Sequence, residues 1–181
     1  QTNDVGNYSV VVSSSYGSVT SAVAVVTIAP STPASGPDWN WVRTLGGNGS
    51  DSTAALASDA AGNVYVTGYF QNTNIIGSRT LIAPKNARNI FLARYDAAGL
   101  PQWALQAGGE KTDTSTGLAT DAQGNVYLTG YFNSSNAAFG PYTLTNPTPS
   151  YTDLFLAKCN SEGVIQWALS ATGTDDDASR A

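Results

Sequence analysis

The 181-residue sequence contains no histidine, no methionine and only one cysteine, Cys159. Histidine is the commonest general base and the commonest protein metal ligand, so its absence removes His-based triads and His-containing metal sites from this segment. A single cysteine excludes an internal disulfide and a cysteine-rich metal site. We interpret Cys159 as a small apolar strand residue rather than a reactive thiol, because Tyr95 stands at the matching place of an internal repeat.

Charge is also scarce, with 8 Lys and Arg against 13 Asp and Glu and a net charge of −5. The few basic residues are scattered singly, which argues against binding of nucleic acid or of an anionic membrane surface. No apolar run reaches the roughly 18 residues of a membrane-spanning helix, and no signal-peptide pattern is present, so we expect no membrane insertion. Because the chain starts at Gln1 and its repeat units are incomplete at both ends, we expect it to be cut from something longer, which makes the missing signal uninformative.

Catalytic motifs are missing as well. The sequence has no G-x-S-x-G elbow, no phosphate-binding loop and no carboxylate pair with a reason for shifted pKa values. We therefore predict no catalytic residue, no cofactor and no enzymatic activity in this segment.

The first thirty residues are dense in Val, Ser and Thr and alternate in the manner of β-strands. The runs 8–13 and 19–28, separated by Tyr16-Gly17-Ser18, predict a hairpin. The stretch Asp4-Val5-Gly6-Asn7-Tyr8 resembles the corner that opens the penultimate strand of immunoglobulin-like domains, although Val10 stands where that family usually has a cysteine. The resemblance implies that residues 1–29 are the C-terminal part of a bacterial immunoglobulin-like domain, followed by a Pro/Ser/Gly linker at 30–37.

An internal repeat governs the remainder of the chain. Residues 41–70 align without gaps on residues 103–132, with 16 of 30 positions identical. The motif "DAAGNVYVTGYF" of the first copy returns as "DAQGNVYLTGYF", and "NIFLARYDAAGLPQW" returns as "DLFLAKCNSEGVIQW". The stretches 71–88 and 133–152 vary between the copies and are predicted to be loops. A third copy opens at Trp167.

Each repeat contains four β-like runs separated by turn signals, which in the first copy cover residues 53–58, 64–70, 90–95 and 102–107. No helical period is present. Four antiparallel strands repeated at a fixed period predict an all-β fold built from β-propeller blades, because one blade cannot cover its own faces.

The quoted motifs, together with W-x4-G-G, resemble the bacterial SBBP-type β-propeller repeats of large secreted or cell-surface proteins. The resemblance covers residues 38–181 and implies a propeller fragment with one blade at 46–107, a second at 108–171 and a partial third at 172–181. Thr172 departs from the motif, since it replaces the first Gly of the pair. Residues 38–45 match the fourth strand of a repeat, and we expect them to close the ring by completing the last blade of the parent protein.

Aromatic residues that recur in every repeat, such as Trp41 and Trp103, are interpreted as packing between blades rather than as sugar platforms. Trp39 and Tyr142 lie outside the repeated motif and are the weak candidates for ligand binding. The Asp-x-x-Gly-Asn joints suggest a Ca²⁺ alternative with Asp59, Asn63, Asp121 and Asn125 as ligands. Their spacing does not fit a calcium loop, so turn capping is the favoured interpretation and no metal site is predicted.

Two functional hypotheses remain open at this stage. The first is a non-enzymatic extracellular or cell-surface module of a large bacterial protein, in which the propeller is a rigid scaffold for adhesion or interaction with a protein or glycan ligand. Its partners would include the remaining blades of the parent chain. The alternative is a non-catalytic fragment of a secreted propeller enzyme, a lyase or polysaccharide-acting enzyme, whose active residues lie outside this segment.

Overall fold

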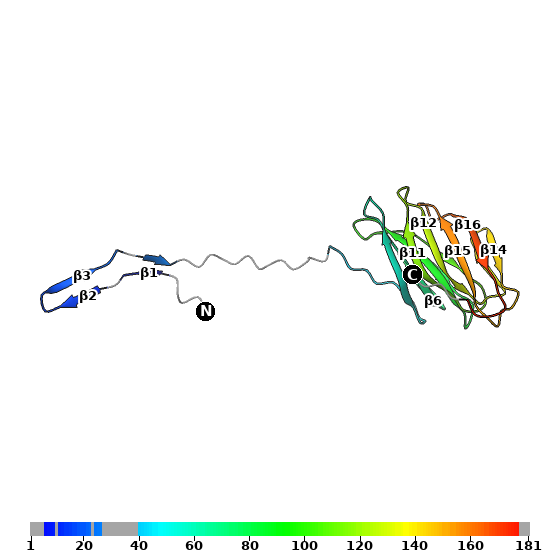
Figure 1. The fold of residues 1–181 in the computed structure, drawn as a ribbon, viewed down its shortest axis with the longest axis horizontal. Coiled ribbons are helices and arrows are strands. Elements are labelled where there is room, and N and C mark those ends of the chain that lie inside the picture. The colour runs from blue at the N-terminus through cyan, green and yellow to red at the C-terminus, as the bar shows by residue number, and fades with distance from the viewer. Residues whose placement is uncertain (1–5, 10, 23, 27–39, 178–181) are drawn as a thin grey trace. The chain divides into compact units, whose positions relative to one another are not determined.

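The computed structural model describes residues 6–9, 11–22, 24–26 and 40–177, and within these ranges the chain forms strands and turns but no helix (Figure 1). The all-β prediction is therefore confirmed for the described residues. None of them forms a helix that could cross a membrane. The chain divides into two compact units, residues 1–39 and 40–181.

The described residues of the first unit form four short strands in two antiparallel pairs. β2 (Val11–Ser14) pairs with β3 (Gly17–Thr20), and β1 (Gly6–Tyr8) pairs with β4 (Ala24–Val26). The expected hairpin is present, but its turn lies at residues 15–16, because Ser14 pairs directly with Gly17. Asp4 and Val10, on which the immunoglobulin-like resemblance partly rests, lie outside the described residues, so that assignment stays a prediction.

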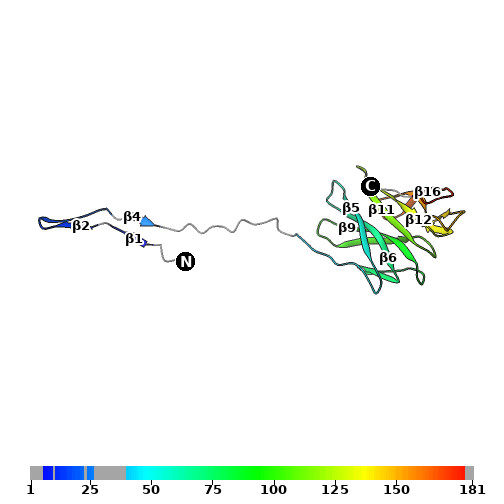
Figure 2. The same cartoon turned by 60° about the horizontal axis from the view of Figure 1, so that its bottom comes forward.

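The second unit contains two four-stranded antiparallel sheets, one for each repeat (Figures 1 and 2). The order of strands in the first sheet is β10-β9-β6-β5, and in the second sheet it is β11-β12-β15-β16. The sheets lie side by side, with β11 against β5 and β6. The bounds are β5 Ser52–Ser58, β6 Val64–Gln71, β9 Arg88–Tyr95, β10 Pro101–Ala107, β11 Asp113–Thr120, β12 Val126–Phe132, β15 Asp153–Cys159 and β16 Ile165–Ala171.

The variable stretches of the two repeats are not the loops that the sequence suggested. Each forms a short antiparallel hairpin, β7 (Thr73–Ile76) with β8 (Arg79–Ile82) and β13 (Asn136–Phe139) with β14 (Tyr142–Thr145). Both hairpins turn through a glycine at positive φ, Gly77 at 60° and Gly140 at 58°, as two-residue hairpin turns require. The prediction of a loop was wrong because sequence variability was read as irregularity, although each stretch has a Gly-containing turn signal, Ile76-Gly77 or Phe139-Gly140, between two short runs.

The glycine of the T-G-Y-F motif is needed for the close approach of the first two strands of each sheet. A Cβ added to Gly68 would lie 1.9 Å from the carbonyl oxygen of Ser52, and one added to Gly130 would lie 2.1 Å from that of Thr114. Any larger residue would push these strands apart. The repetition of this glycine therefore follows from backbone packing.

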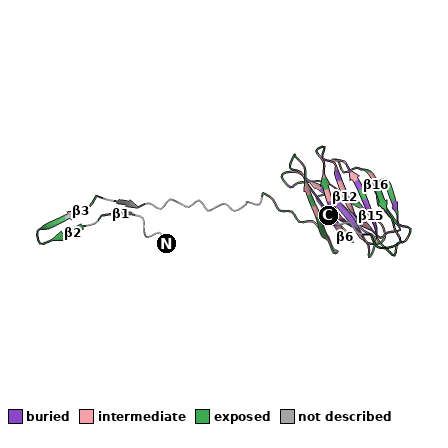
Figure 3. Cartoon of the chain, viewed as in Figure 1, coloured by how far each residue is buried: buried purple, intermediate pink, exposed green. Residues whose placement is uncertain are grey.

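The hydrophobic core lies in two clusters. One joins buried residues of both repeats, including Tyr65, Leu92, Phe132 and Phe155, and thus lies between the sheets. The other covers the opposite face of the first sheet, where Leu45 packs against a cluster that contains Phe70. Figure 3 shows exposed and half-exposed residues along much of β16, the last strand of the second sheet. The repeated aromatic residues thus supply much of the buried surface.

Candidate functional site

The first Asp-x-x-Gly-Asn joint is a tight turn whose carboxylate bonds to its own loop. Asp59 Oδ1 accepts hydrogen bonds from the backbone N–H groups of Ala61 and Asn63, each at 3.0 Å. Its Oδ2 accepts from Asn63 Nδ2 at 2.8 Å and from Tyr65 Oη at 3.1 Å. Gly62 completes the turn with a φ of 78°. Burial tends to raise the pKa of Asp59, but these hydrogen bonds outweigh it and hold the pKa below its ordinary value.

The second joint repeats this geometry. Asp121 accepts from the backbone N–H groups of Gln123 and Asn125 and from Asn125 Nδ2, at distances of 2.8 to 3.0 Å. The hydrogen bond from the Asn125 side chain is the main cause that lowers the pKa of Asp121. Because every carboxylate oxygen of the two turns already accepts hydrogen bonds from protein donors, the geometry favours capping over cation binding. Within the described ranges, no three Asp, Glu or Cys side chains gather as metal ligands would.

The repeated tryptophans make equivalent contacts with the sheet that follows them. Trp103 Nε1 donates to the carbonyl oxygen of Ser161 at 2.8 Å, and Trp41 Nε1 donates to that of Ala97 at 3.1 Å. A Cβ added to Gly163 would meet the ring of Trp103, just as one added to Gly99 would meet the ring of Trp41. These indoles are engaged in packing against a turn, which leaves little of them for a sugar ligand.

The two weak ligand candidates have different outcomes. Tyr142 lies in β14 with its side chain 37% exposed, and its hydroxyl donates to the carbonyl oxygen of Gln166, so it ties the hairpin to β16. Trp39 lies outside the described residues.

Cys159 is buried in the core between the sheets, and burial, with the charge of Glu162 added, raises the pKa of its thiol to about 12. A thiol in that state is unreactive.

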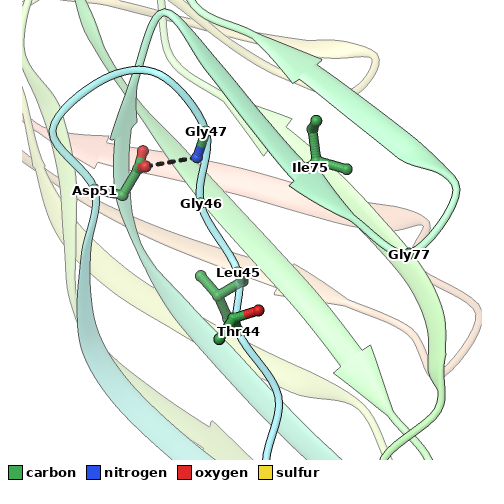
Figure 4. Close-up of a pocket in the computed structure, with 7 residues that line it drawn as sticks. All are labelled: Thr44, Leu45, Gly46, Gly47, Asp51, Ile75 and Gly77. Atoms are coloured by element: carbon green, nitrogen blue, oxygen red, sulfur yellow. Dashed lines mark hydrogen bonds between the residues drawn. The ribbon is translucent and has the colours of Figure 1, made fainter.

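A concavity lies beside the first hairpin (Figure 4). It has a volume of about 640 Å³ and is lined by Thr44, Leu45, Gly46, Gly47, Asp51, Ile75 and Gly77. Figure 4 shows the Asp51 carboxylate facing Gly47, whose N–H donates to it at 2.9 Å. At the matching place in the second repeat, the carboxamide of Asn89 from the first repeat lies against Gly108. The concavity therefore lies where, in the second repeat, a strand of the preceding sheet packs. Its lining residues do not bring a set of polar side chains together.

Asp51 and Asp113 occupy matching positions but differ in their partners. Asp113 is fully buried and accepts from Gly109 N at 2.6 Å, from Ser134 Oγ at 2.7 Å and from two backbone N–H groups at 3.0 and 3.1 Å. Asp51 accepts from Gly47 N, while its buried Oδ1 has no hydrogen-bond partner. The aspartate after the G-G pair thus holds its turn in place by accepting backbone hydrogen bonds. Its hydrogen bonds are complete in the second copy, at Asp113, and incomplete in the first, at Asp51.

Sequence reasoning missed the outward faces of the two inserted hairpins. Their inward residues are alike, since Ile76 and Leu81 of the first match Phe139 and Leu144 of the second, and all four are buried. Their outward residues differ: Thr73, Ile75, Thr80 and Ile82 in the first hairpin, and Asn136, Ala138, Thr143 and Thr145 in the second. Ile75 and Ile82 are 54% and 63% exposed. The signal that would have identified these hairpins is the two-residue turn sequence, Gly77-Ser78 or Gly140-Pro141, between two short runs.

Comparisons with known proteins agree with this architecture. Residues 102–136 match the family model described as the SBBP β-propeller repeat. The chain is also similar to the uncharacterized WD repeat-containing protein L264 of Acanthamoeba polyphaga mimivirus, with 27% identity over 143 residues, covering 70% of this chain and 10% of that protein. The chain thus spans about a tenth of the length of the relative. The prediction of β-propeller repeats is confirmed at this level.

Proposed function

We propose that the two repeats belong to a non-catalytic β-propeller scaffold that binds a protein or glycan ligand through its inserted hairpins. The observation that carries the proposal is the contrast within each repeat. The sheets are alike and their shared residues are engaged in turns and in the core, whereas the outward hairpin residues differ between the repeats. A rigid framework that carries variable exposed segments is the usual arrangement of a binding surface.

The chemistry of the two hairpins further defines the surface. The first presents two exposed isoleucines on its outward face, and the second presents an asparagine, an alanine and two threonines. Apolar side chains exposed at neighbouring positions are typical of a protein contact, whereas short polar side chains suit a hydrated ligand such as a glycan. We assign protein binding to the first hairpin and make glycan binding the alternative outcome of the test.

The proposed setting is an extracellular or cell-surface bacterial protein that carries this segment between further modules. Support comes from the match to the SBBP repeat and from the resemblance of residues 1–29 to the end of an immunoglobulin-like domain. Labelling of intact cells of the source organism with an antibody against residues 40–177 would test the location. Signal that requires permeabilised cells would contradict it.

Exchange of the outward residues between hairpins is the direct test of binding. The variant Thr73→Asn, Ile75→Ala and Ile82→Thr gives the first hairpin the outward face of the second while leaving Ile76 and Leu81 in place. The probes are an array of glycans and an array of purified extracellular proteins, each incubated with the full parent chain. We expect a protein signal that the variant loses and that an exposed control change in a turn, Ala98→Ser, keeps. Equal binding by the variant and the parent chain would overturn the assignment.

A further inference from the structure

Two matching junctions, one at the start of β9 and one at the start of β15, differ in charge. At the first junction, which joins residues 88–89 to 108–113, Arg88 N donates to the carbonyl oxygen of Lys111 at 2.9 Å. At the second, which joins residues 152–153 to 172–177, Asp177 N donates to the carbonyl oxygen of Thr152 at 2.8 Å. The charged residues of the first junction are two basic and two acidic: Arg88, Lys111, Glu110 and Asp113. Those of the second are all acidic: Asp153, Asp175, Asp176 and Asp177.

Asn89 is the buried polar residue of the first junction, with its side chain 3% exposed. In the orientation that satisfies its hydrogen bonds, its amide nitrogen donates to the carbonyl oxygen of Gly109 at 2.9 Å. A Cβ added to Gly108 would lie 3.1 Å from this carboxamide and 2.7 Å from Asp113 Oδ2. An uncharged group therefore lies beside the buried carboxylate of Asp113, whose own oxygens accept hydrogen bonds from protein donors.

Asp153 replaces Asn89 at the second junction and brings a carboxylate to the place of the carboxamide. It is fully buried. Its Oδ1 accepts from Gly173 N at 3.1 Å, whereas its Oδ2 has no hydrogen-bond partner. Among the described residues, no Lys or Arg forms an ion pair with Asp153. Because a buried carboxylate oxygen without a hydrogen bond or a counter-charge is strongly destabilising, this arrangement requires a positively charged partner.

A second carboxylate lies on the other side of Gly173. A Cβ added to Gly173 would lie 3.1 Å from Asp177 Oδ2, while the Gly173 N–H bonds to Asp153. Asp177 is half-buried, and its carboxylate accepts no hydrogen bond from the described residues. Asp175 and Asp176, by contrast, are exposed. Asp153 and Asp177 are therefore the two sheltered carboxylates of this junction, and both have oxygen atoms without a donor.

The chemistry of this pair favours a divalent, oxygen-binding cation. The side chains offer only carboxylate oxygens, which are the ligands of hard cations, and their two negative charges balance a double positive charge. Ca²⁺ accepts irregular sets of about six to eight oxygens that include carbonyl groups and water, whereas Mg²⁺ requires a regular octahedron. Two acidic ligands are also consistent with the finding that, in the described ranges, no three acidic side chains gather as metal ligands would.

We propose that Asp153 and Asp177 bind one Ca²⁺ ion at the second junction. Asp153 Oδ2 and the Asp177 carboxylate supply the charged ligands, and backbone carbonyl oxygens and water complete the shell. The ion balances the charge of the carboxylate that replaces Asn89, and it holds residues 172–177 against the start of β15. The first junction binds no such ion, because it has Asn89 at this place and Arg88 beside it.

Calorimetric titration of the chelator-treated 181-residue chain with CaCl₂ at neutral pH tests the proposal. We expect one site with a dissociation constant on the order of 10⁻⁴ to 10⁻³ M, because only two carboxylates contribute. Asp153→Asn gives the second junction the residue of the first and should weaken binding at least about tenfold. Asp177→Asn should weaken it similarly, and this change leaves the fully buried residues in place. A flat trace for the parent chain, or an undiminished affinity in either variant, would overturn the proposal.

The matched control is Asp121→Asn. This change also removes one carboxylate, but one whose oxygens already accept hydrogen bonds within their own turn. The control variant should bind Ca²⁺ as tightly as the parent chain. A loss of affinity equal to that of Asp153→Asn would mean that Ca²⁺ responds to overall negative charge, which contradicts a site at Asp153 and Asp177.

The melting temperature separates Ca²⁺ binding from protonation of Asp153. About 10 mM CaCl₂ should raise the melting temperature of the parent chain by about 5 °C and that of Asp153→Asn by less than about 1 °C. About 30 mM KCl, which has the same ionic strength, should not reproduce the rise. If Asp153→Asn by itself raises the melting temperature while Ca²⁺ leaves the parent chain unchanged, the buried carboxylate holds a proton instead, and the proposal is wrong.

Discussion

The first and second repeats share their sheet architecture and many residues but stand in different surroundings. The first sheet has a neighbour on each face, residues 41–46 on one side and the second repeat on the other. The second sheet has the first repeat on one side and, among the described residues, only the opening of a third copy on the other. The same residue type, such as Leu92 and Leu156, is therefore buried in one copy and exposed in the other. A comparison of the two copies thus separates the effect of residue type on stability from the effect of burial.

Removal of the buried phenylalanine ring that both repeats share should lower the free energy of unfolding more than any other change proposed here. The loss should be equal in the two repeats. Phe70 and Phe132 are both fully buried. Either Phe→Ala change should lower the free energy of unfolding by about 4 kcal/mol, through lost transfer energy and the cavity left behind. Urea unfolding followed by tryptophan fluorescence measures both. A twofold difference between the two variants would show that the repeats are not equivalent at this position.

Substitution of the aspartates that follow the G-G pair, Asp51 and Asp113, should lower the free energy of unfolding by different amounts. Asp113→Ala leaves several buried donors without an acceptor and should cost about 3 kcal/mol. Asp51→Ala removes the hydrogen bond from Gly47 N together with a buried oxygen that has no partner, and should cost about 1 kcal/mol. Thermal unfolding of both variants would rank them. The reverse ranking would mean that the hydrogen-bond difference between the repeats has no energetic effect.

The threonines of the two matching faces give a smaller contrast. Thr67→Val removes a buried hydroxyl that bonds to Phe91 and contacts Ser115 of the next repeat, so it should cost about 1.5 kcal/mol. Thr129→Val, on the open face, should cost about 0.5 kcal/mol because water replaces the lost partner. The changes in urea midpoint provide the measurement. Equal shifts would argue that the Thr67 and Ser115 contact contributes nothing.

The two turn aspartates, Asp59 and Asp121, should contribute alike to the pH dependence of stability. Their contribution is the smallest of those compared here. The folded-state pKa values of Asp59 and Asp121 lie below the ordinary 3.8. Their stabilising contribution is therefore fully present above pH 3.8 and is lost as the pH falls through the folded pKa values. The melting temperature of the parent chain should drop on acidification below about pH 4, and less so for Asp59→Asn or Asp121→Asn. A parallel drop in parent chain and variants would contradict this origin.

Much of the sheet framework could be predicted from the sequence because it is repeated. Alternation in the β6 and β12 segments, with Asp-x-x-Gly-Asn turns before them, indicated the strands and their joints. The hairpins β7–β8 and β13–β14 were missed because strands were predicted from motifs that recur in both repeats, and the sequences of these segments differ between the repeats. The glycine turn in the middle of "TNIIGSRTLI" was the evidence that remained.

The surroundings of each repeat could not be predicted in the same way. Leu92 and Leu156 stand in the same F-L-A motif, so no local pattern distinguishes the buried leucine from the exposed one. Burial depends on whether another repeat follows, which is a property of the assembled sheets. The same limit applies to residues 40–45, which match a fourth strand in sequence yet form no ladder here, while Gly46 bridges to Ile75 of the first hairpin as Gly108 bridges to Ala138. Closure of a ring by these residues stays a prediction.

The central claim is that the second repeat buries the face that the first repeat presents to it, while the second repeat's own matching face is open. The most direct measurement compares Leu92→Ala with Leu156→Ala in the 181-residue chain by urea unfolding. We predict a loss of about 3 kcal/mol for Leu92→Ala, which opens a cavity between the sheets, and of less than about 1 kcal/mol for the half-exposed Leu156→Ala. Equal losses for the two variants would contradict the account.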